Sequence, residues 1–339
     1  MIKISGVSRK YYCRILYLHI ALVLVYNVFV LSTPSEVLYT MEFGLYVSDC
    51  KKIRLVVCAD CSRESSAPFA LTHILLTPKF DTRGVVSSHF GKAGSRIDSC
   101  NEAKKVIEHM ELEKDIPVIM GAAKALDNEF TPENSEGSSF IVREANSRDL
   151  APLHILCLGP LTDVASAILT DPSIAPKLTI TWVGCPSFPE GGYEKNLEND
   201  ICAANAILDC KSRLRIITAA ATKAFTISLA ELEYRANNRG AAGCHLYNHT
   251  LDCFESTTSK ASDEEGECWN VDAMAGAAFF LKCHETQIIP APRISDDMKY
   301  IDALDGKPVA FCQWIDARFT IEDFFAKLSL QYPLYKRFR

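Results

Sequence analysis

The amino-acid sequence predicts one large α/β domain built on an open, mostly parallel β-sheet flanked by helices. Two patterns support this prediction. From about Ile53 onward, short apolar segments rich in β-branched residues recur along the chain, as in strands that are buried on both faces. Between these strand segments lie others in which apolar residues recur every three or four positions, as in amphipathic helices. Strand and helix therefore alternate, which is typical of βαβ crossovers and of a parallel sheet with helices on both sides.

Six strands are expected, and each is a short, predominantly apolar run. They span residues 53–57, 84–86, 117–120, 153–158, 178–183 and 214–217. The fourth is the clearest of the six. We see no internal repeat, so the sheet is expected to belong to a single domain.

Helices are expected between these strands. Pro68 suits the first turn of a helix whose apolar face runs through residues 69–76. In residues 101–112 the apolar side chains recur at spacings of three and four, as on one face of a helix. Further helices are expected at residues 161–169, 201–208 and 273–281. The polar residues 128–139 are expected to form a loop, and the acidic residues 255–267 a surface insertion.

The net charge limits the classes of ligand that the protein is expected to bind. The chain has 339 residues and a formal net charge of −6. Without a basic stripe to neutralise phosphates, it is not expected to bind a nucleic-acid backbone. A small neutral or cationic ligand is more compatible with this charge.

The 14 cysteines are scattered along the chain and do not form a framework. Cys58 and Cys157 fall in or next to expected strands and are predicted to be reduced, buried thiols. Cys58 and Cys61 have the C-x-x-C spacing, but no second pair follows at zinc-ligand spacing. A redox or zinc site is therefore not favoured.

The N-terminal region, residues 1–40, has two interpretations. Residues 15–31 are apolar except for His19 and Asn27, and basic residues precede them, as in a signal peptide or membrane anchor. On this interpretation the protein is membrane-associated or secreted and contacts a membrane through residues 15–31. Alternatively, the region is an extension upstream of a natural start near Met41, and the protein is cytoplasmic, as the cysteines favour.

Polar residues follow several expected strands, at the sheet edge where open parallel sheets bind ligands. Asp60 follows the first strand, Thr162 the fourth, and Asp272 opens the helix at residues 273–281. The loop after the fifth strand contains Glu194, Asn196 and Asp200. Converging carboxylates and a threonine could hold a hard divalent cation, which takes oxygen ligands. Singly, these residues could instead cap helices or solvate a loop, but their joint occurrence favours a site.

Longer motifs surround these residues. Residues 158–163 read LGPLTD, residues 171–175 read DPSIA, and residues 189–205 read PEGGYEKNLENDICAAN. Residues 75–80 (LLTPKF), 89–91 (HFG), 131–140 (TPENSEGSSF), 228–232 (SLAEL) and 315–328 (IDARFTIEDFFAKL) add to them. With these motifs the chain resembles the inosine-uridine-preferring nucleoside hydrolase family, and more closely its bacterial nucleoside hydrolase-like subgroup.

The resemblance covers about residues 53–328. It implies a nucleoside hydrolase-like, Rossmann-like domain there, with residues 329–339 as a C-terminal tail. Members of the family hydrolyse the N-glycosidic bond of ribonucleosides with a calcium ion held by aspartates. The expected partner is thus a small ribonucleoside-like substrate and not a nucleic acid. A homo-oligomer is compatible with these expectations.

The resemblance also assigns roles residue by residue. Asp60 takes the place of a metal ligand that is also the general base. Thr162 would offer its carbonyl group to the metal, and Asp272 would be the distant metal ligand. Glu194, Asn196 and Asp200 are expected to bind the substrate, and Glu194 and Asn196 to contact its ribose.

At several positions the chain departs from the family pattern. Cys58 stands at the first aspartate of the opening motif, Ser66 and Ala67 at a later pair of aspartates, and Val271 at a histidine of some members. Lys195 replaces a phenylalanine, while Glu64 matches a glutamate of the subgroup. The metal-ligand cluster is therefore expected to be degraded. Three interpretations remain open: a hydrolase with altered metal ligation, a sugar- or nucleoside-binding pseudoenzyme, and a structural or interaction protein.

Overall fold

The computed structural model describes residues 47–62, 66–149, 151–257, 268–301 and 305–334. From Val47 onward these residues form one compact unit. The apolar segment 15–31 lies outside the described residues. Within the described ranges, no helix is both long enough and apolar enough to cross a membrane.

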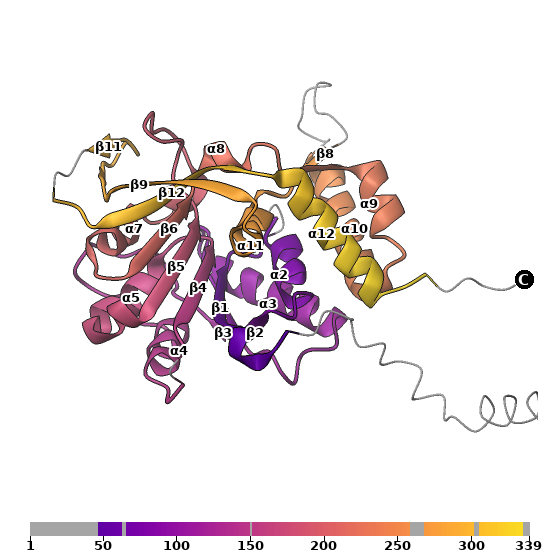
Figure 1. Ribbon diagram of the computed structural model, residues 1–339, viewed down its shortest axis with the longest axis horizontal. Helices are drawn as coiled ribbons and strands as arrows, with labels where there is room; N and C mark the ends of the chain where they lie inside the picture. Colours follow the sequence, from indigo (N-terminus) through magenta and orange to yellow (C-terminus); the bar gives the residue numbers. More distant parts are fainter. Residues whose placement is uncertain (1–46, 63–65, 150, 258–267, 302–304, 335–339) are drawn as a thin grey trace, which may run out of the picture. The chain divides into compact units, whose positions relative to one another are not determined.

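The centre of this unit is an eight-stranded sheet with the strand order β3-β2-β1-β4-β5-β6-β12-β9 (Figure 1). All neighbouring strands pair in parallel except β12 and β9, which are antiparallel. The strands are β1 (Ile53–Ala59), β2 (Phe80–Ser87), β3 (Val118–Met120), β4 (Leu153–Leu158), β5 (Leu178–Val183), β6 (Arg213–Ile217), β9 (His284–Pro290) and β12 (Pro308–Ile315). The predicted open, mostly parallel sheet is confirmed.

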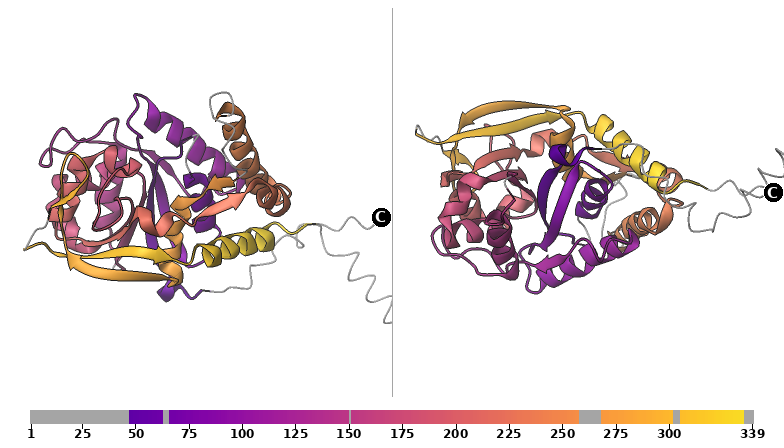
Figure 2. Two further views of the ribbon diagram at one scale, coloured as in Figure 1. Left: turned by 90° about the horizontal axis from the view of Figure 1, so that it is seen from above. Right: turned by 60° about the horizontal axis from the view of Figure 1, so that its bottom comes forward.

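Helices cover both faces of the sheet, as Figure 2 shows from two further directions. One face packs against α2 (Ala67–Leu75), α3 (Ser95–His109), α10 (Gly240–Thr257), α11 (Ala275–Leu281) and α12 (Ala317–Gln331). The other packs against α4 (Glu136–Ala145), α5 (Thr162–Thr170) and α7 (Ile201–Asp209). Leu55 and Val57 of β1 enter the first core, whereas Val56 and Cys58 enter the second. Strands buried on both faces explain the uninterrupted apolar runs in the sequence.

Short elements complete the described chain. They are the 3₁₀ helices η2 (Asp49–Lys51), η3 (Pro172–Lys177) and η4 (Asp272–Met274), the helices α6 (Lys195–Glu198), α8 (Ala219–Thr222) and α9 (Leu229–Arg235), and the strands β7 (Thr226–Ser228), β8 (Cys268–Asn270), β10 (Arg293–Ile294) and β11 (Tyr300–Ile301). Strands β7 and β8 form one two-stranded sheet, and β10 and β11 another.

The structure corrects several of the predicted elements. Residues 128–139 do not form a continuous loop, because α4 begins at Glu136. The side chain of Ser135 accepts a hydrogen bond from the backbone N–H of Ser138, and this capping box starts the helix in a polar segment. Helix α3 begins at Ser95 rather than at residue 101, and α12 extends to Gln331, beyond the expected domain end. The segment 255–267 lies mostly outside the described residues.

The two cysteines assigned to the core are fully buried, as predicted. Cys58 on β1 and Cys157 on β4 are paired by the register of the sheet. A hydrogen bond with Cys157, together with burial, raises the pKa of the Cys58 thiol well above its usual value. Cys58 is therefore a protonated core residue, at a position where the resemblance predicted an aspartate.

Candidate functional site

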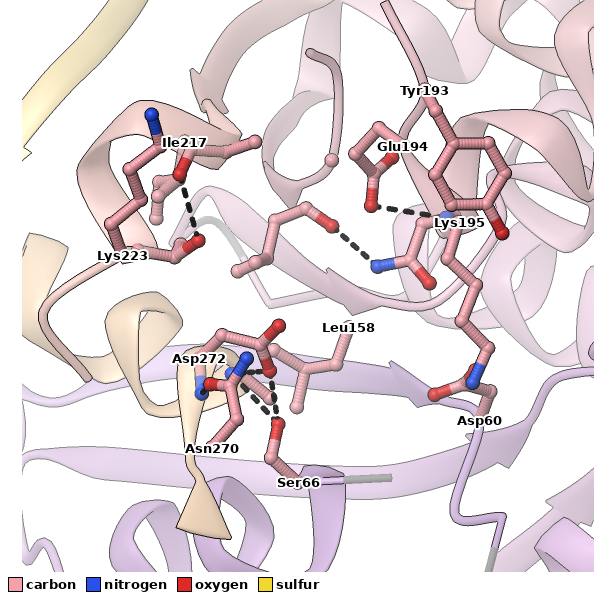
Figure 3. Close-up of a pocket in the computed structure, with 16 residues that line it drawn as sticks. Asp60, Ser66, Leu158, Tyr193, Glu194, Lys195, Ile217, Lys223, Asn270 and Asp272 are labelled. Atoms are coloured by element: carbon pink, nitrogen blue, oxygen red, sulfur yellow. Dashed lines mark hydrogen bonds between the residues drawn. The ribbon is translucent and has the colours of Figure 1, made fainter. Parts of the chain in front are cut away.

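A cavity of about 470 Å³ opens at the carboxyl ends of the central strands. Asp60 follows β1 in its wall, and Leu158, Val183 and Ile217 end β4, β5 and β6 there. Strand ends are the usual ligand position in an open parallel sheet. Of the six predicted site residues, four line this cavity: Asp60, Glu194, Asn196 and Asp272 (Figure 3). They are widely separated in the sequence, so the topology of the sheet brings them together.

Asp60 is held where β1 and β4 end side by side. Its side chain is only 3% exposed, although it borders the cavity. Gly159 follows β4 directly, and a Cβ atom there would lie 3.1 Å from the Cβ of Asp60. A glycine after β4 therefore permits the close approach of the two strand ends that positions this carboxylate.

Glu194 organises the loop that carries it. Its carboxylate accepts hydrogen bonds from the backbone N–H groups of Cys185 (3.1 Å), Asn196 (3.0 Å) and Leu197 (2.8 Å), and so it caps α6. Burial raises the pKa of Glu194 to about 7, and the neighbouring charge of Asp272 acts in the same direction. Near neutral pH this group can therefore both donate and accept a hydrogen bond at the cavity wall.

Asn196 lies in the same loop as Glu194, and a hydrogen bond to β5 fixes its side chain. Its side-chain amide donates a hydrogen bond of 2.8 Å to the carbonyl oxygen of Val183, the last residue of β5. The amide oxygen remains an acceptor that a ligand in the cavity could use. Glu194 and Asn196 together present two polar side chains to the cavity from one short loop.

Asp272 is tied to the start of α2. One of its carboxylate oxygens, Oδ1, accepts hydrogen bonds from the Ser66 hydroxyl and from the backbone N–H of Ala273. Ser66 also accepts a hydrogen bond of 3.0 Å from the N–H of Ala273. Ser66, which the resemblance aligns with an aspartate, thus contacts the carboxylate that was predicted to be the distant metal ligand.

Thr162 and Asp200 lie away from the cavity wall, in a buried hydrogen-bonded chain. The Thr162 hydroxyl donates to Oδ2 of Asp200 at 2.6 Å, and Nε2 of His89 lies 2.8 Å from the same hydroxyl oxygen. Asp200 also accepts the backbone N–H groups of Leu126 and Ala203. These side chains hold together the loops beneath the site. Thr162 does not line the cavity. Leu158, which was not among the predicted site residues, lines it instead.

Other wall residues were also missed. Tyr193, Lys195, Lys223 and Asn270 line the cavity. In Figure 3 the side chain of Lys195 extends toward Asp60. The sequence offered one signal for Lys195, because the resemblance predicted a phenylalanine at this position. The chain carries a flexible cation there instead.

We predict that His89 makes the domain sensitive to acid. Its Nδ1 accepts the N–H of Gly91 at 3.3 Å, so the proton resides on Nε2 and is donated to Thr162. Burial lowers the pKa of His89 to about 4. In the unfolded chain the pKa is about 6.5. Neutral His89 therefore contributes roughly 3 kcal/mol to the free energy of unfolding. This contribution is complete above pH 6.5 and is lost as the pH falls toward 4.

The measurement is urea unfolding of the unmodified protein and of His89→Gln between pH 7.5 and 4. Because other buried groups titrate in this range, the informative quantity is the difference between the two proteins. The variant should lose less stability on acidification, since glutamine does not titrate. Parallel pH profiles for the two proteins would contradict this role of His89.

The comparisons with known proteins agree with this architecture. Residues 66–303 match the family model for inosine-uridine preferring nucleoside hydrolase. A search of curated proteins gave no match. Among solved structures, a purine-preferring ribonucleoside hydrolase from Gardnerella vaginalis is similar with a TM-score of 0.70 and 16% identity, covering 82% of this chain and 99% of that one.

Two further structures show the same fold. A plant nucleoside hydrolase has a TM-score of 0.68 and 17% identity, over 81% of this chain and 98% of its own. The inosine-uridine preferring nucleoside hydrolase from Bacillus anthracis has a TM-score of 0.62 and 14% identity, over 83% and 100%. The family model spans most of the chain, and the fold and the strand-end cavity agree with it. The chain therefore belongs to the inosine-uridine preferring nucleoside hydrolase family.

Proposed function

We propose that the protein binds a ribonucleoside in the strand-end cavity and hydrolyses its N-glycosidic bond slowly. The observation that carries the proposal is the convergence of Asp60, Glu194, Asn196 and Asp272 on one cavity in a chain of this family. Its volume of about 470 Å³ suits a small molecule. The carboxylates suit a reaction in which positive charge develops on the sugar.

In this proposal Asp60 removes a proton from the attacking water. The water oxygen then bonds to the anomeric carbon, and the bond from that carbon to the base breaks. Its electron pair leaves on the base nitrogen, which takes a proton from solvent. Glu194 and Asn196 hold the sugar hydroxyls, and Glu194 suits a hydroxyl because burial places its pKa at about 7.

The residues present do not fit the calcium centre that the family implies. Calcium takes about six to eight oxygen ligands, and its affinity follows the number of carboxylates. Here Asp60 and Asp272 are the aspartates on the cavity wall, and Ser66 supplies a hydroxyl. The Glu194 carboxylate already accepts three backbone N–H groups, and Ala67 is buried in the apolar core. Within the described ranges, no three Asp, Glu, His or Cys residues are grouped to hold a metal ion. We therefore derive no step through a metal.

A nucleoside-binding protein without turnover is the second candidate. The Ser66 hydroxyl already binds Asp272, and the Lys195 side chain extends toward Asp60 (Figure 3). Both side chains compete with the positioning of a catalytic water. They leave intact Glu194 and Asn196, which are assigned to the sugar.

The test measures binding and turnover separately. Inosine and uridine are titrated calorimetrically into the protein, and release of free ribose is followed with and without added calcium. We expect binding with slow release, and in Asp60→Asn a further loss of release of about a hundredfold or more with little change in binding, because an amide cannot take the proton.

Tyr193→Phe is the matched control, since Tyr193 lines the cavity but its hydroxyl donates to Glu198, which is not one of the proposed site residues. Binding without any release would support the second candidate. Neither binding nor release would overturn both.

A further inference from the structure

A thiol and an amine meet at the end of α7. Cys210 follows the last residue of this helix, and Lys307 directly precedes β12, which pairs with β6 (Figure 1). Nζ of Lys307 lies 3.7 Å from Sγ of Cys210. Both groups donate a hydrogen bond to the carbonyl oxygen of Ile207, at 2.8 Å from the amine and 3.2 Å from the thiol. This shared acceptor holds together two side chains that are 97 positions apart in the sequence.

The thiol is open to small molecules, and the amine is shielded from water. Cys210 is partly exposed and lines a cavity of about 250 Å³. Lys307 is half-buried, and burial lowers the pKa of its ammonium group, although Cys210 and Asp209 act in the opposite direction. A lysine shifted in this way carries more of the neutral amine, which is its nucleophilic form. The pair therefore combines an accessible sulfur with a nucleophilic nitrogen beside it.

We propose that Cys210 and Lys307 form a peroxide-sensitive pair, in which oxidation of the thiol joins the two side chains through a sulfur–nitrogen bond. This inference does not depend on the proposed function. In the first step the sulfur of Cys210 attacks hydrogen peroxide and the oxygen–oxygen bond breaks. The thiol is oxidised by two electrons to a sulfenic acid, and the peroxide is reduced to water.

In the second step the neutral amine of Lys307 attacks the sulfur, and the sulfur–oxygen bond breaks. The hydroxide that leaves takes a proton from the nitrogen and departs as water. Sulfenic acids condense with a backbone nitrogen in the same way, and Lys307 offers a more basic one. The product is a sulfenamide in which the protein has lost two hydrogen atoms. An added thiol reverses the reaction by attacking the sulfur.

The test is to treat the full-length protein with hydrogen peroxide, with and without dimedone, which traps sulfenic acids, and to identify the peptides by mass spectrometry. Without dimedone we expect a cross-linked pair of peptides that contain Cys210 and Lys307. The pair should be lighter by two hydrogen atoms than the two peptides together, and dithiothreitol should separate it again.

Lys307→Arg is the matched variant, since arginine keeps the cation and the N–H donors but is not a neutral nucleophile. In this variant the cross-link should disappear. Dimedone labelling of Cys210 should rise at least about tenfold, because the sulfenic acid has no amine with which to condense. Cys244 is the reference thiol, because it is also partly exposed and its sulfur contacts the amide of Asn248, which is not a nucleophile. Its labelling should be the same in both proteins.

The cross-link should also raise the melting temperature. It closes a loop between residues 97 positions apart, which lowers the entropy of the unfolded chain as a disulfide does. After peroxide treatment the unmodified protein should therefore melt a few degrees above Lys307→Arg, and dithiothreitol should remove this gain.

Equal dimedone labelling of Cys210 in the two proteins, with no cross-linked peptide, would overturn the proposal. A disulfide between Cys210 and another cysteine in place of the sulfur–nitrogen bond would also overturn it. The search for the cross-linked peptide needs only the unmodified protein, so it decides the question even if Lys307→Arg does not fold.

Discussion

Replacing Ser66 and Ala67 together by aspartate should raise calcium affinity and ribose release by about a hundredfold or more. The aspartate at position 66 would join Asp60 and Asp272 on the cavity wall, and calcium affinity rises with the number of charged ligands. Position 67 is fully buried at the start of α2, so its carboxylate would become a ligand only after a shift of that helix end. A firmly held ion positions its water, and misplacement of a reacting group alone can cost about a hundredfold in rate. Without calcium, an aspartate at position 66 would face Asp272, whose Oδ1 now accepts from the Ser66 hydroxyl.

The measurement is a calcium titration of the double variant, with thermal unfolding and ribose release recorded at each concentration. Calcium should raise the melting temperature of the variant more than that of the unmodified protein, because a ligand stabilises the state that binds it. Ser66→Asn with Ala67→Asn is the matched control for size, since the amides add little charge. Adding Asp60→Asn to the double aspartate variant should abolish the gain in ribose release.

The prediction depends on Ser66 and Ala67 standing at the former aspartate pair. Efficient, calcium-dependent turnover by the unmodified chain would contradict it. Glu64, which lies outside the described residues, would then be the candidate for the missing ligand. Replacing Glu64 by glutamine would test that alternative directly.

Truncating Leu156 to alanine should lower the free energy of unfolding by about 2–5 kcal/mol. Leu156 lies in the central strand β4 and is fully buried. It packs closely against α11: a Cβ atom at Gly276 would lie 2.9 Å from Leu156 Cδ1 and 2.9 Å from Leu158 Cδ2. Helix α11 follows directly from η4, which begins at Asp272. The cavity left by the truncation would therefore also loosen the support of a predicted site residue.

Urea unfolding measures this loss, with Ile155→Val as the control. Ile155 is equally buried but enters the core on the other face of the sheet, and the change should cost about 0.5–1.5 kcal/mol. The Leu156 variant should also bind nucleosides more weakly than the control variant. A stability loss below about 1 kcal/mol would mean that the packing of β4 against α11 tolerates the truncation.

The sequence by itself determined six strands of the parallel part of the sheet and the edge that carries the site, but not β9 and β12, which complete the sheet. Apolar runs such as residues 153–158 are local signals, because a strand buried on both faces needs apolar side chains in both directions. The alternation of strands and helices implied parallel pairing, and the rule for strand ends then placed Asp60 at one edge. Asp272, which opens a helix, was assigned to the same site through the family resemblance. No knowledge of side-chain contacts was required for either step.

Tertiary structure alone decided which polar residues reach the cavity. Thr162 and Asp200 follow the same rule as Asp60, yet they bond to each other beneath the site, where Thr162 opens α5 and Asp200 caps α7. Glu102 and His245 meet across 143 residues of sequence because α10 packs on α3. Sequence periodicity reports which face of an element is buried. It does not report which distant element covers that face, and only the packed fold sets that contact.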